Sequence, residues 1–177
     1  PTPFDYASSI LSELQGNKPF RISVLILLLT NCAITLVAVN IPYYLQYAIE
    51  MKSLQTSIIS TLFITAILAV PVWVLIAKRF GKIESYRVAM ICYTLVLSLL
   101  PLVEPGQITF AFTCAVLAGF FHAAALMLPW AIVPDVVEFD ELRVGKRREG
   151  LFYGGTTFSY KLASAMAIFI SGGVLQH

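Results

Sequence analysis

Residues 134–161, PDVVEFDELRVGKRREGLFYGGTTFSYK, place a charged stretch between two long apolar segments. The first part, residues 135–150, holds five acidic and four basic residues in sixteen positions. A single lysine, Lys161, then lies well inside the second apolar segment. Apolar segments of this length are typical of membrane-spanning helices, and a charged side chain inside one is energetically costly. Lys161 is therefore a candidate functional residue, and the flanking segments are candidate membrane spans.

The composition predicts an all-α membrane protein. Hydrophobic residues make up 58% of the 177 residues and charged residues only 12%, whereas about a quarter of a typical soluble domain is charged. The net charge is only +2, and the basic residues lie at the ends of apolar runs without forming a basic stripe. We therefore expect the lipid bilayer as a partner and no nucleic acid.

Five apolar segments have roughly the length that crosses the hydrocarbon core of a bilayer. They form a predicted transmembrane bundle over residues 19–177, which follows a short polar segment at residues 1–18. The five predicted spans cover approximately residues 20–49, 54–77, 88–103, 108–133 and 151–174. We expect the chain to be a piece of a longer protein.

The basic residues predict which side of the membrane each loop faces. Lys52 is the one basic residue between the spans on one side, and Lys161 lies inside a span. The other ten gather on the opposite side: Lys18, Arg21, Lys78, Arg79, Lys82, Arg87, Arg143, Lys146, Arg147 and Arg148. Because basic loops stay in the cytoplasm, residues 1–18, 78–87 and 135–150 are predicted to be cytoplasmic. The protein is thus expected to be an integral, multi-pass protein of a plasma or inner membrane.

Lys161 lies ten residues after Leu151, or about 15 Å along a helix, so its side chain does not easily reach either membrane surface. Its burial costs roughly 2.5–3.5 kcal/mol on insertion scales. A carboxylate, a substrate or water in a cavity must offset that cost, and a structural salt bridge is the alternative. We expect Thr157 and Ser164 to share its helix face and to contribute to substrate binding.

The opposite face of the same span carries small residues at intervals of four. They are Gly155, Ser159, Ala163, Ala167 and Ser171. Such a stripe lets two helices approach closely, so a neighbouring helix is predicted to pack against it.

Other polar or aromatic residues inside the spans are further candidates for substrate binding. Asn31 and Thr35 are four residues apart and share a helix face, so they should face other helices or water; interhelical hydrogen bonding is the alternative. Trp130 could anchor the helix at the membrane surface. His122 could relay protons or simply pack as a neutral ring.

The charged stretch at residues 135–150 suits a gate. Its candidate gating residues are Asp135, Glu138, Glu141, Arg147 and Glu149. Ion pairs across a hairpin could hold an inner gate closed in one state and separate in the other. A solvated charged turn is the alternative interpretation.

The same stretch carries a family resemblance. Its matching positions are Asp135, Glu138, Phe139, Glu141, Gly145, Arg147, Glu149 and Gly150. They resemble a cytoplasmic signature of the glycoside–pentoside–hexuronide:cation symporters, the melibiose–sodium symporter-like family of the major facilitator superfamily. Residues 17–20, NKPF, are similar to the start of that family's seventh helix. Residues 79–82, RFGK, are similar to its loop between helices eight and nine.

The resemblance implies that the chain comprises helices seven to eleven, most of the carboxyl-terminal half of a transporter. Residues 1–18 would link the two halves, and six preceding helices and a twelfth helix would be partners within the same protein. The family works by alternating access: a sodium ion or proton and a substrate share a central cavity near the membrane midplane. Its cation-binding carboxylates lie mainly in the amino-terminal half, so no cofactor is expected here.

The family resemblance also bears on two candidate residues. Lys161 falls where the eleventh helix of the family carries a cavity lysine. The family's tenth helix has a tryptophan that contributes to sugar binding, and Trp130 lies roughly one turn closer to the cytoplasm. The implied function is cation-coupled symport of a small polar solute, a sugar or glycoside.

Two alternative functions stay open. A lysophospholipid or another amphiphile could be carried by the same fold, and the displacement of Trp130 leaves room for that substrate. A membrane scaffold or receptor that transports nothing is the alternative of another class. An enzyme is not expected, because the sequence offers no nucleophile–base pair and no metal-ligating cluster, and its two histidines are His122 and His177.

Overall fold

The computed structural model describes residues 18–145 and 149–175, all of whose long elements are helices. The helices are α2 (Lys18–Tyr43), α3 (Gln55–Phe80), α4 (Lys82–Leu99), α5 (Ile108–Val144) and α6 (Glu149–Leu175). A π-helical turn, η1 (Tyr44–Ala48), extends α2, and the short 3-10 turns η2 (Lys52–Leu54) and η3 (Leu100–Leu102) precede α3 and follow α4. The all-α prediction is confirmed.

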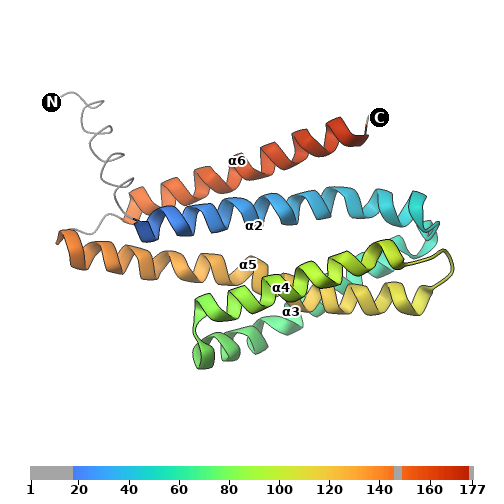
Figure 1. The fold of residues 1–177 in the computed structure, drawn as a ribbon, viewed down its shortest axis with the longest axis horizontal. Helices are drawn as coiled ribbons and strands as arrows, with labels where there is room; N and C mark the ends of the chain where they lie inside the picture. Colours follow the sequence, from blue (N-terminus) through green and yellow to red (C-terminus); the bar gives the residue numbers. More distant parts are fainter. Residues whose placement is uncertain (1–17, 146–148, 176–177) are drawn as a thin grey trace.

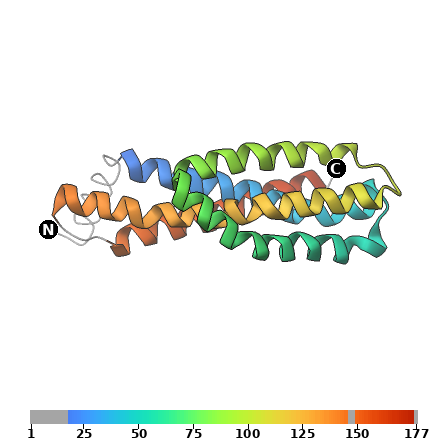
Figure 2. The ribbon, with the colours of Figure 1, turned by 90° about the horizontal axis from the view of Figure 1, so that it is seen from below.

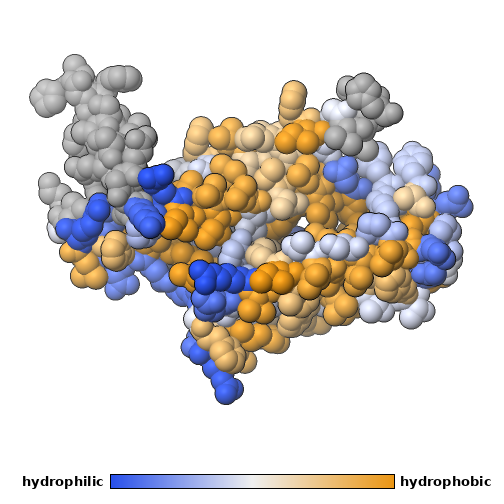
Figure 3. Space-filling model, in the orientation of Figure 1, coloured by the Kyte–Doolittle hydropathy of each residue, from blue (hydrophilic) through white to orange (hydrophobic). Residues whose placement is uncertain are grey.

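The helices form an elongated bundle around α5, which packs against each of the other four (Figures 1 and 2). On one side α2 and α6 lie side by side and run in the same direction, and on the other side lie α3 and α4 (Figure 1). Hydrophobic residues cover much of the visible face, and hydrophilic residues gather at the two ends and around the turn between α3 and α4, at the bottom of the view (Figure 3). This distribution matches a bundle that stands across a bilayer.

Four of the described helical segments are long and apolar enough to cross a membrane. They are Lys18–Ala48, Lys52–Phe80, Lys82–Leu102 and Ile108–Arg143. The fifth predicted span corresponds to α6, whose 27 residues extend about 40 Å, more than the thickness of the hydrocarbon core. The chain is therefore an integral membrane protein, while the positions of the membrane surfaces along these helices stay predictions.

Helix α5 continues well beyond the predicted span at residues 108–133, so much of the charged stretch is helical where a loop was expected. The extension buries Val136 and Val137 against Phe20 of α2 and Phe152 of α6. Gly145 then ends the helix with φ of 73°, and its N–H donates to the carbonyl of Glu141. Glycine adopts this left-handed conformation without strain, which makes it a common helix terminator.

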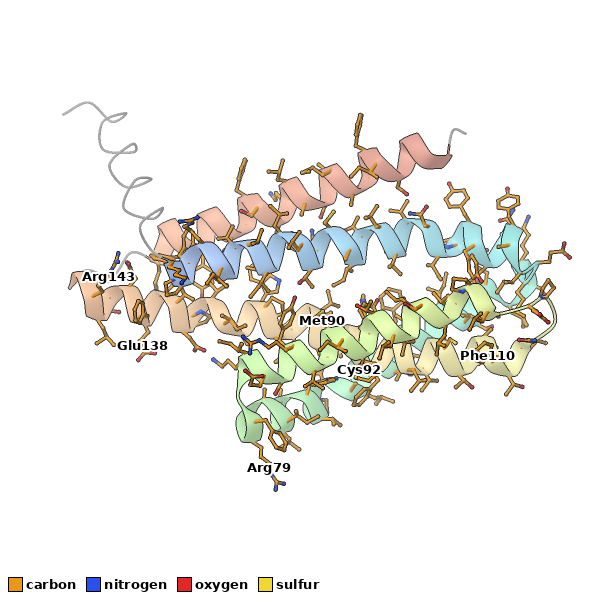
Figure 4. All side chains as sticks on the ribbon, viewed as in Figure 1. Arg79, Met90, Cys92, Phe110, Glu138 and Arg143 are labelled. Atoms are coloured by element: carbon orange, nitrogen blue, oxygen red, sulfur yellow. The ribbon has the colours of Figure 1, made fainter. Side chains whose placement is uncertain are left out.

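The basic turn expected at residues 78–87 is also shorter than predicted. Helix α3 runs through Phe80 and α4 begins at Lys82, so Gly81 alone separates them, with φ of 89°. Figure 4 shows Arg79 pointing away from the bundle at this turn. The basic residues thus lie on helix ends, where the positive-inside rule still applies to them.

The stripe of small residues on α6 faces α2, as predicted. Ser159, Ala163, Ala167 and Ser171 are buried, and the two helices pack against each other along their lengths. At the start of this contact the rings of Phe20 and Phe152 meet edge to face with centroids 4.7 Å apart. This packing fixes which face of α6 is left uncovered.

Candidate functional site

Asn31 connects α2 to the middle of α6. Its buried side-chain amide donates hydrogen bonds to the carbonyl of Tyr160, at 2.8 Å, and to Oγ of Ser164, at 2.6 Å. The Ser164 hydroxyl in turn donates to the same Tyr160 carbonyl. Two predicted substrate-binding residues are therefore brought together, and the interhelical hydrogen bond that was the alternative for Asn31 is present.

Trp130 of α5 completes this junction. Its ring packs against the ring of Tyr160 with centroids 5.7 Å apart and an angle of 55° between the planes. Trp130, Tyr160, Asn31 and Thr30 border a hollow of about 10 Å³, roughly the size needed for one water molecule. The junction therefore joins three helices by polar and aromatic contacts and leaves no room for a solute between them.

Lys161 and Thr157 lie on the exposed side of α6. Within the described residues no ion pair or hydrogen bond involves the ammonium group of Lys161. Ser164 lies at the border of this exposed side and is turned toward α2, where it meets Asn31. Thr35, one helical turn beyond Asn31, is half-buried on α2.

The exposed side of α6 has two chemically different edges. At about 100° per residue, Thr157, Lys161 and Ser164 fall within a sector of about 60°. The next sector carries large apolar side chains, of which Phe158 is 67% exposed and Phe169 is 83% exposed. Along residues 157–164 the first edge is therefore suited to water or a polar ligand, although Ile168, 56% exposed, continues the same sector beyond them. The other edge is suited to lipid.

Asp135 forms an ion pair with Lys82 at the start of α4, a contact that the sequence did not suggest. The ammonium group of Lys82 lies 2.6 and 2.7 Å from its two carboxylate oxygens and also donates to the carbonyl of Ala131 at 2.9 Å. Arg147, the basic member of the ion pairs expected across the hairpin, lies outside the described residues, so those pairs stay a prediction. The pairing was missed because the sequence suggested a loop at Asp135, whereas the continuing helix turns its carboxylate toward the start of α4.

The predicted gating residues Glu138, Glu141 and Glu149 lie together where α5 ends and α6 begins. Glu138, Glu141 and Glu149 line a groove of about 240 Å³, together with Val137 and Tyr153. Figure 4 shows Glu138 on the extension of α5, near Arg143. Three carboxylates therefore border one groove between α5 and α6.

Sequence reasoning missed two polar contacts. Asp140 is 1% exposed, and its carboxylate lies 3.9 Å from the guanidinium of Arg143. Asn40 donates to Oγ of Ser171 at 2.7 Å, a second polar bridge between α2 and α6. The signal for Asp140 was its position three and four residues after Val137 and Val136, which places it on their buried helix face.

His122 packs inside the bundle. Its Nδ1 lies 3.1 Å from the hydroxyl of Tyr93 on α4, and its ring meets the ring of Phe63 edge to face at 6.2 Å. Of the two interpretations of this histidine, the contacts match a packed ring with one hydrogen-bond partner. In the described part of the chain no group of three or more His, Cys, Asp or Glu side chains is placed to hold a metal ion.

Comparison with known proteins gives the family. A family model described as "MFS/sugar transport protein" matches residues 7–177. The chain belongs to this family of the major facilitator superfamily. The resemblance drawn from the charged stretch is thereby confirmed, and the members named in the family and among the relatives are transporters, not enzymes.

Three relatives illustrate the range of the family. The chain is 31% identical over 162 residues to an uncharacterized symporter of Synechocystis sp., covering 91% of this chain and 30% of the relative. It is 34% identical over 165 residues to a putative sulfoquinovose importer of Salmonella typhimurium, covering 88% and 34%. It is 25% identical over 163 residues to the sodium-dependent lysophosphatidylcholine symporter 1-A of Danio rerio, covering 91% and 30%. The chain thus spans about a third of the length of these relatives.

Proposed function

We propose that this chain is part of a secondary active transporter that carries a small polar solute, a sugar or glycoside, together with a sodium ion or proton. The observation that carries the proposal is the polar edge of α6, where Lys161 is exposed beside Thr157 and the Asn31–Ser164 junction. A charged group at this depth in a membrane helix is expected to face a water-filled cavity. The adjacent apolar edge, with Phe158 and Phe169 exposed, offers a surface for lipid.

In this proposal the exposed lysine binds an acceptor group of the solute. A lysine ammonium has three donors, and solute oxygens would replace the water that hydrates it. Trp130 would contribute an aromatic surface at the margin of the path. The coupling cation would be bound mainly by helices outside this chain, as the family resemblance implies.

The charged residues at the cytoplasmic ends of α5 and α6 would form part of the inner gate. Exposed ion pairs are individually worth under about 1 kcal/mol, so they break readily during a transport cycle. Glu138, Glu141 and Glu149 border one groove, and Arg147 would supply a positive charge near it. Alternating access would then close and open this end of the path.

Uptake by the protein expressed as its complete reading frame tests the proposal. In proteoliposomes with an imposed sodium or proton gradient, Lys161→Ala should abolish concentrative uptake of a glycoside, while Lys52→Ala, on the predicted outer loop, should leave it unchanged. Normal uptake by Lys161→Ala at equal protein density would contradict a role in binding or coupling. No uptake by the unaltered protein would favour the alternative of a scaffold or receptor, which transports nothing.

A second candidate is a carrier of lysophospholipids or other amphiphiles. The observation in its favour is that sodium-dependent lysophosphatidylcholine symporters match the chain over as much of its length as the bacterial symporter does. The same proteoliposomes distinguish the two substrates, because uptake of a labelled lysophosphatidylcholine without uptake of glycosides would select the amphiphile.

A further inference from the structure

Helix α6 is held in the bundle mainly by α2. It packs against α2 along its length and contacts α5 far less, so its rotation about its own axis depends on what α2 presents to it. Apolar contacts have no preferred direction and restrict that rotation weakly. Hydrogen bonds require a particular geometry and restrict it more strongly. At the level of Lys161, such hydrogen bonds come from Asn31.

Asn31 is placed to fix α6 next to Lys161. Its amide donates to the carbonyl of Tyr160, the residue before Lys161, and to Oγ of Ser164, three residues after it. The ring of Tyr160 also packs against Trp130 of α5. Because the two acceptors precede and follow Lys161 in the chain, a turn of α6 about its axis at this level would break both bonds.

Asn31 is itself connected to the other side of the bundle. The preceding residue, Thr30, shares a hydrogen bond between hydroxyl groups with Tyr86 of α4. Both Thr30 and Asn31 are buried. Consecutive residues of α2 thus connect α4 to α6, and they set the orientation of Lys161 relative to the rest of the bundle.

The same contacts leave Asn31 no donor for a solute. A side-chain amide has two N–H donors, and both are donated to α6. The residue is 4% exposed, and the adjacent hollow of about 10 Å³ has room for roughly one water molecule. A direct contact between Asn31 and a transported solute is therefore not what this geometry serves.

We propose that Asn31 is a positioning residue for transport, which acts on the solute only through the orientation it gives to Lys161. The inference rests on the proposed function, in which Lys161 binds the solute, and adds how that lysine is directed. Binding groups must be held within about 10–20° of their productive orientation, and a misplacement of about 1 Å can cost about 100-fold in rate. The two bonds from Asn31 supply that restraint.

Asn40 provides a matched control, because it joins the same two helices away from the lysine. Its amide donates to Oγ of Ser171 and to the carbonyl of Leu36 on its own helix. Ser171 lies ten residues after Lys161, or about 15 Å along α6. Asn31→Ala and Asn40→Ala should each weaken the contact between α2 and α6, but only Asn31→Ala should disturb Lys161.

Cysteine reactivity measures the orientation of α6 without any solute. The protein, expressed as its complete reading frame, carries Lys161→Cys with its other cysteines replaced by alanine, and it is treated in lipid vesicles with a charged methanethiosulfonate reagent. Adding Asn31→Ala should change the rate of modification several-fold, while adding Asn40→Ala should leave it unchanged. Ser164→Ala removes one of the two acceptors and gives the same comparison if Asn31→Ala does not fold. An unchanged rate in Asn31→Ala, or equal changes in the two asparagine variants, would overturn the proposal.

Uptake of a labelled methyl glucoside, with Lys161 in place, separates positioning from a loss of folded protein. Asn31→Ala should raise KM at least about tenfold, because a small displacement of a binding group costs that much or more. Asn40→Ala should lower only the amount of folded transporter, and therefore the maximal rate, with KM unchanged. An equal rise of KM in both variants would indicate a general structural role and overturn the proposal.

The two assays separate this inference from the proposed function. If the unaltered protein takes up no glucoside, while the reactivity at position 161 changes in Asn31→Ala alone, Asn31 still positions α6 and the proposed glycoside substrate is wrong. Uptake that requires Lys161 but keeps its KM in Asn31→Ala would leave the proposed function standing and remove the inference.

Discussion

Gly119 marks a close approach of α3 and α5. A Cβ atom at this position would lie 2.3 Å from the carbonyl oxygen of Leu62 and 3.0 Å from Cβ of Thr65. The first of these atoms belongs to the backbone of α3, which cannot move aside as the end of a flexible side chain does. Close contact through a small residue is a common way for membrane helices to pack.

We predict that Gly119→Ala destabilises the bundle by about 1–3 kcal/mol, the usual cost of overpacking. Thermal unfolding of the purified protein in a mild detergent measures the change. Gly154→Ala on α6 is the matched control, because a Cβ there has nothing within 4 Å. Equal unfolding midpoints for the two variants would contradict the close contact at Gly119.

At the scale of elements, the ion pair between Lys82 and Asp135 fixes the start of α4 against α5. Their side chains are 39% and 54% exposed, so the pair alone contributes little in water. The same ammonium group also donates to the carbonyl of Ala131, which ties it to the backbone of α5 next to Pro134. The contact therefore positions the start of α4 more than it stabilises the fold.

We predict that Lys82→Ala and Asp135→Asn each lower stability by under about 1 kcal/mol, as for other exposed pairs. A double-mutant cycle should show that their effects are not additive, because both variants break the same contact. The same cycle for Arg87→Ala and Glu84→Gln serves as a comparison, because that exposed pair lies within one helix, α4. Strict additivity for Lys82 and Asp135 would indicate that the pair does not form in the membrane.

The order of the five helices and the face of α6 that packs against α2 could be predicted from the sequence, because apolar length and a stripe of small residues are local signals. The extent of α5 could not. Pro134 and the charged residues after it suggested the start of a loop. The contacts that support the continuing helix are tertiary, because Val136 and Val137 pack against Phe20 and Phe152. No window of sequence around residue 134 contains those partners.

In the candidate site, too, the sequence identified residues but not the tertiary contacts between them. Asn31 and Ser164 stood out as polar residues in apolar spans, and the structure brings them together. Their pairing depends on the parallel register of α2 and α6, which neither span encodes alone. Lys82 was one of many basic residues near a predicted turn, and its role at Asp135 emerged only when α5 was seen to continue through that position.

At the scale of the whole molecule, the account depends on a difference between two edges of one helix. Lys161 and Thr157 border the Asn31–Ser164 junction, and Phe158 and Phe169 occupy the adjacent exposed sector. A bundle that stands in lipid on all exposed sides would have no use for such a division. A transporter that closes around a water-filled path requires it, since its helices must meet lipid on one edge and water on the other.

Cysteine accessibility measures this division directly. Lys161→Cys and Phe169→Cys are introduced separately after Cys32, Cys92 and Cys114 are replaced by alanine, and a charged, membrane-impermeant methanethiosulfonate reagent is applied to the protein in lipid vesicles. The account predicts rapid modification at position 161, slowed by transported solute, and negligible modification at position 169. Equal reactivity at the two positions, or no reaction at position 161 from either side of the membrane, would contradict a water-filled path along α6.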